Sequence, residues 1–222
     1  MGNGLFVTGT GTDVGKTYVT ALIVKKLQDA GYSSGYYKAA LSGAQRIADS
    51  DAGYVKKISG ISQQEETMVS YLYQNAVSPH LAARLEGNPV TLSKIRQDYD
   101  KVCESYDYVT VEGSGGIVCP LRWDKEEHIL LEDVVKELEL NALIVADAGL
   151  GTIHAAVTTA EYMKNRGISV KGIILNHYTG GEMQKDNRRM IEELAGIPVA
   201  ACVGEKDTEL AMDAEMLAGF YE

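Results

Sequence analysis

A glycine-rich segment followed by lysine and threonine is the part of this sequence best suited to chemistry. It reads Gly9-Thr10-Gly11-Thr12-Asp13-Val14-Gly15-Lys16-Thr17 and lies between an apolar run and a helical pattern. At such a junction, backbone N–H groups and the positive end of a helix dipole converge on one anion. We therefore expect Lys16 to contact the terminal phosphates of a nucleotide and the Thr17 hydroxyl to coordinate Mg²⁺.

The glycine spacing departs from the usual phosphate-binding loop, or P-loop. Five residues separate Gly9 from Gly15, one more than in the common pattern. The alternative is a structural glycine-rich turn before a helix. The strand and helix patterns on either side favour the phosphate site.

A second lysine follows the next strand pattern. Lys38 lies in the segment Tyr36-Tyr37-Lys38-Ala39-Ala40-Leu41-Ser42-Gly43. In a doubly wound sheet the end of this strand lies beside the P-loop, so both lysines would point into one cleft. A solvated lysine at a strand end is the alternative. Ser42 could present its hydroxyl to a bound ligand.

Two carboxylates are candidates for holding the cation. Glu112 ends an apolar strand pattern, and we expect it across from Thr17, where an oxygen ligand suits Mg²⁺. Asp51 begins a helical pattern, where helix capping is an equal alternative to metal binding. The glycine-rich loop expected after Glu112, residues 113–116, could donate N–H groups to a phosphate.

These residues must be positioned by an alternation of β-branched apolar runs with longer helical patterns, which predicts an α/β fold. Continuously apolar strands are typical of a sheet buried on both faces. We expect a single-domain, doubly wound, mostly parallel sheet flanked by helices. The expected strands include 5–8, 108–112, 142–146, 170–175 and 199–203, and the expected helices 18–30, 92–106, 132–140, 152–166 and 182–195.

The chain length suits one unit over residues 1–222, with room for a sizeable core. Between the second and third expected strands, Ser78-Pro79 and Asn88-Pro89 interrupt the patterns. We expect an irregular, loop-rich insertion at about 66–90.

Composition excludes several classes of protein. With 21 basic and 31 acidic residues the net charge is −10, which disfavours nucleic acid as a partner. The three cysteines are far apart and predict reduced thiols in a cytoplasmic protein. No apolar window is long enough to cross a membrane, and no leader pattern begins the chain. The four histidines show no metal-ligand spacing.

Several ordered motifs together resemble the dethiobiotin synthetase family, which is P-loop NTPase-like in fold, and the resemblance covers most of the chain. The longer glycine spacing of the P-loop is itself a feature of that family. The remaining motifs are Tyr-Lys-x-x-x-Ser-Gly at 37–43, Ser-Asp-Ala at 50–52, Ser-Pro-His at 78–80, Val-Glu-Gly-x-Gly-Gly at 111–116, Leu-Gly-x-Ile at 150–153, Asn176, Ile-Pro at 197–198 and Gly-Glu at 204–205.

The resemblance implies a reaction: ATP- and Mg²⁺-dependent carboxylation of 7,8-diaminononanoate with CO₂ or bicarbonate, then ring closure through a carbamate and a carbamic-phosphoric anhydride. It implies Lys16 and Lys38 as catalytic residues and Mg²⁺ bound by Thr17, Asp51 and Glu112. It also implies a homodimer that completes the substrate site. The implied substrate contacts are Lys38, Ser42, Gly116, Leu150 and Gly151, and the implied ATP contacts are Thr12, Asp13, Val14, Gly15, Lys16, Thr17, Glu112, Gly113, Ser114, Gly115 and, at the adenine, Asn176.

Some positions depart from the family pattern. Ala39 replaces a common proline, and His154-Ala155 replaces a common Asn-His pair. The alternative function is a regulatory ATPase switch of the ParA/MinD type, but the P-loop lacks that class's early lysine and the C-terminal stretch is acidic. The synthetase-like half of a cobyrinate amidase and a catalytically silent nucleotide-binding module are further alternatives.

Overall fold

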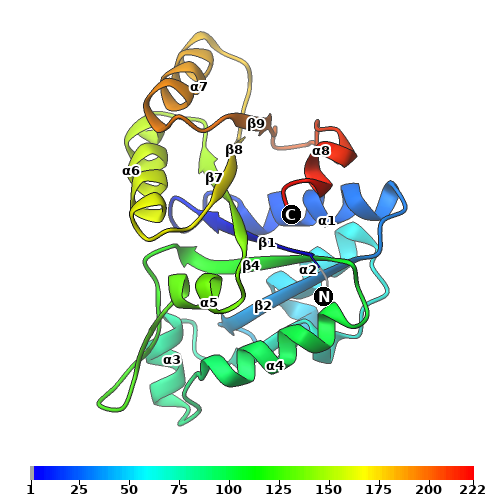
Figure 1. The fold of residues 1–222 in the computed structure, drawn as a ribbon, viewed down its shortest axis with the longest axis vertical. Coiled ribbons are helices and arrows are strands. Elements are labelled where there is room, and N and C mark those ends of the chain that lie inside the picture. The colour runs from blue at the N-terminus through cyan, green and yellow to red at the C-terminus, as the bar shows by residue number, and fades with distance from the viewer. Residues whose placement is uncertain (1–2) are drawn as a thin grey trace.

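A seven-stranded sheet whose strand pairings are all parallel forms the centre of the computed structural model, which describes residues 3–222. Its order is β3-β2-β4-β1-β7-β8-β9, so β1 lies between strands from both halves of the chain (Figure 1). A small antiparallel hairpin, β5–β6, lies outside it. The strands are β1 (Asn3–Gly9), β2 (Ser34–Ser42), β3 (Val69–Tyr73), β4 (Tyr108–Gly116), β5 (Pro120–Trp123), β6 (His128–Leu130), β7 (Asn141–Asp147), β8 (Val170–Asn176) and β9 (Val199–Cys202).

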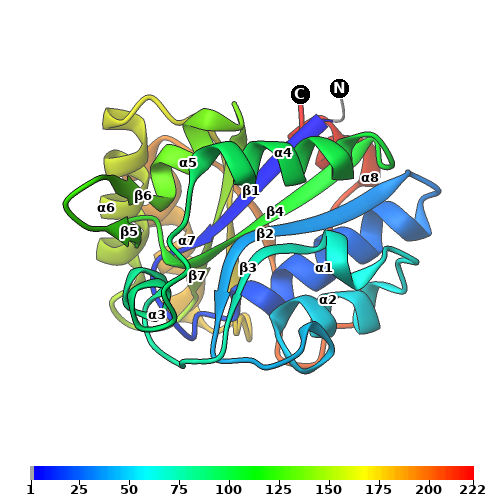
Figure 2. The same ribbon diagram turned by 90° about the horizontal axis from the view of Figure 1, so that it is seen from below.

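Helices cover both faces of the sheet, as Figure 2 shows for α4 and α5 on one side and α1 and α2 on the other. Alternate residues of β1 point to opposite faces: Leu5 and Val7 pack with α1, whereas Phe6 packs in the cluster on the other face. The helices are α1 (Lys16–Asp29), α2 (Asp51–Ser59), α3 (Pro79–Leu85), α4 (Leu92–Cys103), α5 (Leu131–Glu137), α6 (Thr152–Asn165), α7 (Glu182–Ala195) and α8 (Ala214–Ala218), with short 3-10 turns η1 (Ile47–Asp49) and η2 (Glu65–Thr67).

The doubly wound architecture expected from the sequence is confirmed, as are the expected strands and helices, with ends that shift by a few residues. Thr91 begins α4 as its N-cap, since its hydroxyl accepts a hydrogen bond from the Lys94 N–H. Gly196, in left-handed backbone, ends α7. The P-loop therefore occupies the β1–α1 junction at the carboxyl edge of the sheet.

The segment 66–90 is more regular than expected. It contains α3 and the edge strand β3, which pairs in parallel with β2 from Lys38↔Val69 to Ser42↔Tyr73. Tyr71 and Tyr73 are buried, so the short aromatic run packs as a strand although proline-containing turns follow it. The expectation of an irregular insertion was wrong in this respect.

Candidate active site

The P-loop holds two residues in left-handed backbone, Asp13 at φ 60° and Gly15 at φ 81°. Gly15 lies directly before α1, so the N–H groups of the first turn face the same space as the loop. Gly15 also lets the Asn176 side chain approach: a Cβ at this position would lie 1.9 Å from Asn176 Nδ2. Backbone conformation and close packing both require glycine here.

We expect the substitution Gly15→Ala to weaken nucleotide binding at least about tenfold. The left-handed conformation alone costs a non-glycine residue about 1–2 kcal/mol, and the new Cβ would also displace Asn176. Calorimetric titration with MgATP and the melting temperature measure the two effects. The matched control is Gly11→Ala, because a Cβ there meets nothing within 4 Å. Equal affinities in the two variants would contradict this requirement.

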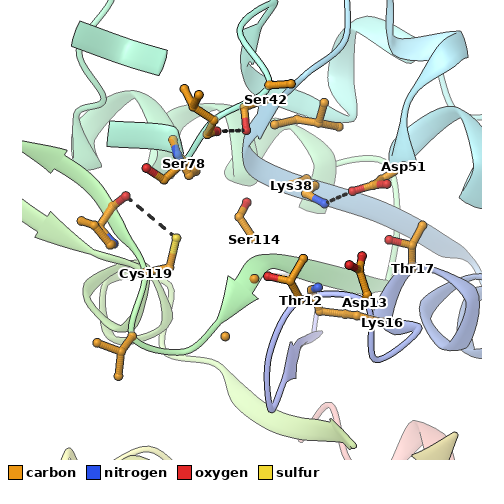
Figure 3. A pocket seen from close by; sticks show the side chains of 18 of the residues that line it. Thr12, Asp13, Lys16, Thr17, Lys38, Ser42, Asp51, Ser78, Ser114 and Cys119 are labelled. Carbon is orange, nitrogen blue, oxygen red and sulfur yellow. Dashed lines mark hydrogen bonds and ion pairs between the residues drawn. The ribbon is translucent and has the colours of Figure 1, made fainter. Parts of the chain in front are cut away.

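Lys38 joins the two carboxylates named from the sequence. Its Nζ lies 2.6 Å from Asp51 Oδ2 and 3.0 Å from Glu112 Oε1 (Figure 3 draws the first). The Thr17 hydroxyl donates to Glu112 Oε1 at 2.8 Å. Ser50, the N-cap of α2, makes no side-chain cap hydrogen bond, and the Asp51 carboxylate contacts Lys38. P-loop hydroxyl, strand lysine and both acids thus form one cluster.

Burial and charge act in opposite directions on this cluster. Burial would lower the pKa of Lys38, but Glu112 and Asp51 raise it above its ordinary value. Burial would raise the pKa of Asp51, but Lys38 and then Lys16 lower it. The pKa of Lys16 is lowered by burial, against the attraction of Glu112. The carboxylates therefore outweigh burial at Lys38 but not at Lys16.

Tyr36 is a member of this cluster that sequence reasoning missed. Its hydroxyl donates to Glu112 Oε2 at 3.0 Å, and the side chain is fully buried. Burial, with the Glu112 charge, raises the pKa of Tyr36 well above its ordinary value, so the phenol stays a donor. Tyr36 and Lys38 are two residues apart in β2, so their side chains lie on one face of the strand. This alternation was the sequence signal that could have predicted Tyr36 as part of the cluster.

The cluster opens into a cavity of about 660 Å³. Figure 3 shows the P-loop on one side of it and Ser78 on the other. Most site residues expected from the sequence line this cavity: Thr12, Asp13, Gly15, Lys16, Thr17, Lys38, Ser42, Asp51, Ser114, Gly115 and Gly116. Residues not expected there also line it, namely Leu41, Ala76, Val77, Ser78, Pro79, Val118, Cys119 and Pro120.

The glycine run after Glu112 does not form the expected loop. It continues β4 to Gly116, which pairs with Gly9 of β1. A Cβ at Gly113 would lie 2.7 Å from the Phe6 ring, so Gly113 faces the core. The Ser114 hydroxyl donates to the Ala40 carbonyl at 2.7 Å. These small residues remain in strand conformation because the Phe6 side chain and the Gly9 backbone lie close to β4.

Several expected residues lie outside the cavity wall. Glu112 is buried within the cluster, and Val14 accepts a hydrogen bond from Asn176 through its carbonyl. Asn176 is buried at the end of β8. Leu150 is 94% exposed in the turn before α6, which begins after Gly151. The structure thus brings the P-loop, Lys38 and the two carboxylates together, and leaves the turn that contains Leu150 and Gly151 at the surface.

Cys119 borders the cavity. Burial raises the pKa of its thiol to about 11, although Lys16 and Lys38 oppose this. The thiol contacts the Pro120 carbonyl at 3.9 Å. Since the thiolate is the nucleophilic form, this direction of the pKa disfavours nucleophilic chemistry at Cys119.

Comparison with known proteins identifies close full-length relatives. The model of a family described as "AAA domain" matches residues 3–210. An ATP-dependent dethiobiotin synthetase BioD from Brachyspira hyodysenteriae (strain ATCC 49526 / WA1) is 48% identical, with all of both chains covered. Another from Clostridium botulinum (strain Loch Maree / Type A3) is 47% identical over all of this chain and 99% of its own.

Solved structures with the same fold are more distant in sequence. A chain of the MinC:MinD cell division protein complex of Aquifex aeolicus matches with a TM-score of 0.59 at 16% identity, over 92% of this chain and 82% of that one. A ParA family ATPase from Chlorobium tepidum TLS matches with a TM-score of 0.56 at 14% identity, over 99% and 97%. At such identities the likeness shows a P-loop NTPase-like fold alone.

Proposed function

The chain belongs to the ATP-dependent dethiobiotin synthetase family and is an ATP-dependent cyclo-ligase, and from this premise we propose how its pocket closes a cyclic urea on 7,8-diaminononanoate. The observation that carries the proposal is the pair of buried cations, Lys16 and Lys38, beside one cavity. Both anions of the reaction, the carbamate and the γ-phosphate of ATP, must meet there. A site that brings two anions together needs fixed positive charge around their meeting point.

The chemical steps balance without covalent participation of the protein. One amine of the diamine takes up CO₂ and loses a proton, giving a carbamate. A carbamate oxygen attacks the γ-phosphorus, and ADP leaves. The second amine then attacks the carbonyl carbon of the mixed anhydride, and phosphate and a proton leave. The chain's contribution is binding, orientation and stabilisation of charge, as is typical of phosphoryl transfer.

The two lysines serve different partners in this scheme. Lys16 and the P-loop N–H groups hold the β- and γ-phosphates, while Lys38 and the Ser42 hydroxyl hold the carbamate. Lys38 stands on β2, opposite the P-loop, and this placement supports the division. The burial that lowers the pKa of Lys16 favours a bound phosphate as its partner. Lys38 would turn from the carboxylates toward the carbamate.

The donor set fits Mg²⁺. One hydroxyl and two carboxylates converge from the P-loop, α2 and β4, and hard oxygen ligands of this kind bind Mg²⁺ together with phosphate oxygens. We assign Thr17, Asp51 and Glu112 to it. When bound, the ion neutralises charge on the transferred phosphoryl group. Lys38 neutralises the same two carboxylates in the structure.

We infer that the base and the far end of the substrate extend out of the cavity described above, whose lining includes residues 114–116. We assign Asn176, beside the P-loop, to the adenine, and Gly115 and Ser114 to the nucleotide. Gly116, Leu150 and Gly151 are assigned to the substrate. Because Leu150 is almost wholly exposed, we propose that a second copy of the chain covers it in a homodimer that completes the site.

Replacing Leu150 by a charge tests the dimer. We expect Leu150→Asp to shift the protein toward monomer in sedimentation velocity and to raise KM for the diamine about tenfold or more, because a charge is expensive to bury at an interface. ATP affinity should stay unchanged. Leu85→Asp, at an exposed position on α3, is the control. A Leu150→Asp protein with unchanged assembly and unchanged KM would contradict this assignment.

One assay separates the ligase from its alternative. Purified protein with MgATP, bicarbonate and 7,8-diaminononanoate should release ADP and phosphate and form the cyclic urea, detected by mass. ATP hydrolysis indifferent to the diamine would instead indicate a ParA/MinD-like switch. The full-length identity to named synthetases favours the ligase, because the MinD and ParA likenesses concern fold only.

We propose that residues 1–222 act as one ligase unit in the cytoplasm, where thiols stay reduced. The single large sheet supports one unit, and the acidic charge supports a partner that is a small molecule and not nucleic acid. Within residues 3–222 the structure has no helix of the length and apolarity that a membrane crossing needs.

A further inference from the structure

Three side chains at the carboxyl ends of β7 and β8 form a hydrogen-bonded array that ends on the P-loop. Asp147 and Asn176 are direct partners in strand register, and His177 follows Asn176. His177 Nδ1 lies 2.6 Å from Asp147 Oδ2, and its Nε2 lies 3.2 Å from Asn176 Nδ2. Asn176 Nδ2 also donates to the Val14 carbonyl at 3.0 Å. We call Asp147, His177 and Asn176 the amide array.

The partners of the amide array constrain the direction of its hydrogen bonds. A carboxylate only accepts, so His177 donates from Nδ1, and in the neutral imidazole Nε2 then accepts. The Asn176 amide nitrogen therefore donates one hydrogen to His177 and the other to Val14. A reversed amide would place its oxygen against the Val14 carbonyl oxygen, where no hydrogen is available.

Asn176 Oδ1 is consequently the one polar atom of this amide without a hydrogen-bond partner among the described residues. Asn176 is wholly buried, and its Oδ1 has no hydrogen-bond partner within residues 3–222. A buried acceptor without a donor is unfavourable, so this atom indicates a ligand that brings an N–H group. Among nucleobases, adenine carries an exocyclic amino group where guanine carries a carbonyl.

The backbone also maintains the amide array. His177 has φ 56°, a left-handed conformation that a non-glycine residue rarely adopts. Its carbonyl accepts a hydrogen bond from Gln184 Nε2 at 3.1 Å, which ties this conformation to α7. On the other side, Asp147 Oδ1 accepts from the Gly149 N–H at 2.6 Å. The pair is thus fixed from two neighbouring loops.

We propose that Asp147 and His177 are positioning residues that lock the Asn176 amide with Oδ1 toward the nucleobase, so that the site selects an amino-bearing base over a carbonyl-bearing one. The inference rests on the proposed function, in which Asn176 faces the base. In this proposal both residues act through the Asn176 amide. Without the imidazole, the Val14 carbonyl alone opposes reversal of the amide, so nitrogen is more readily presented to a carbonyl-bearing base.

Calorimetric titration with MgATP and with MgGTP, in the absence of the diamine, tests this lock. The variant His177→Asn removes the imidazole, and asparagine tolerates left-handed backbone. We expect its Kd for MgATP to rise about three- to tenfold and its preference for ATP over GTP to fall. Asp147→Ala should act similarly, and the double variant should add little, because both act through one amide. Asp147→Asn should lose less of the preference than Asp147→Ala, since its one oxygen can accept from His177 in place of the Gly149 N–H.

The control is His128→Asn on the β5–β6 hairpin, with melting temperatures measured throughout to confirm folding. Unchanged binding in both His177→Asn and Asp147→Ala would overturn the inference. Equal loss for ATP and GTP, with the preference intact, would also overturn it, because it would indicate a structural role alone. An unmodified protein that binds neither nucleotide would instead refute the proposed function, so the two failures are distinguishable.

Discussion

The substitution Lys38→Met should lower kcat for diamine-dependent ADP release about 10²- to 10³-fold, the typical cost of losing one group that stabilises developing charge. Methionine preserves the length and burial of the side chain but carries no charge. The affinity for MgATP should change far less, because the P-loop and Lys16 bind the phosphates. Steady-state kinetics of ADP release and calorimetric titration with MgATP separate the two effects.

Lys101→Met on α4 is the matched control, since that lysine is largely exposed and pairs only with Asp98 among the described residues. Lys38 is itself part of a buried ion pair, so the melting temperature of Lys38→Met must show that the variant folds. Turnover within about threefold of the unmodified protein would contradict the catalytic role of Lys38. Loss of MgATP binding in parallel with kcat would assign Lys38 to the nucleotide instead.

The substitution Glu112→Gln should raise the Mg²⁺ concentration required for half-maximal activity at least about tenfold and lower kcat at saturating Mg²⁺. Glutamine preserves the shape of the side chain but has a single oxygen, whereas Thr17 and Tyr36 donate to different oxygens of the carboxylate. The charge is lost, and the new amide N–H₂ group cannot accept from the donors that face it, which are either Tyr36 or the pair Thr17 and Lys38. Activity measured across a range of Mg²⁺ concentrations at fixed ATP provides the test.

Glu193→Gln on α7 is a suitable control, because that carboxylate is exposed and pairs with Arg189. If Glu112 served only to hold Lys38, then Glu112→Gln would lower kcat without changing the Mg²⁺ requirement. That result would remove Glu112 from the proposed metal ligands. It would leave the assignment of Thr17 and Asp51 to be tested separately by substitution.

The phosphate side of the pocket was predictable because its signals are local. The Gly-Lys-Thr sequence at a strand–helix junction specifies its own backbone geometry, and the parallel strand β2 places Lys38 beside it, within the strand and not at its end as the sequence indicated. Asp51 was ambiguous between capping and metal binding, since both use the same residue at a helix start. The three-dimensional structure favours the role in the site over capping, because the Asp51 carboxylate contacts Lys38.

Other features depend on contacts that a single sequence does not display. A buried Tyr36 in a strand looks like any core tyrosine until Glu112 is found next to its hydroxyl. The glycines after Glu112 indicated a loop, yet close pairing of Gly116 with Gly9 keeps them in β4. His177 has no metal-ligand spacing to another histidine, so no function was predicted for it from the sequence. Its proposed positioning role depends on Asp147, which lies at the end of the neighbouring strand β7.

The two sides of the pocket differ in how firmly the sheet holds them. The P-loop follows β1, which has hydrogen-bonded strands on both sides, whereas Ala76, Val77 and Ser78 follow β3, which has only β2 beside it. An edge strand opens at a lower free energy than the core of the same sheet. Local opening of β3 would therefore move one wall of the cavity while the P-loop on the other wall stays in place.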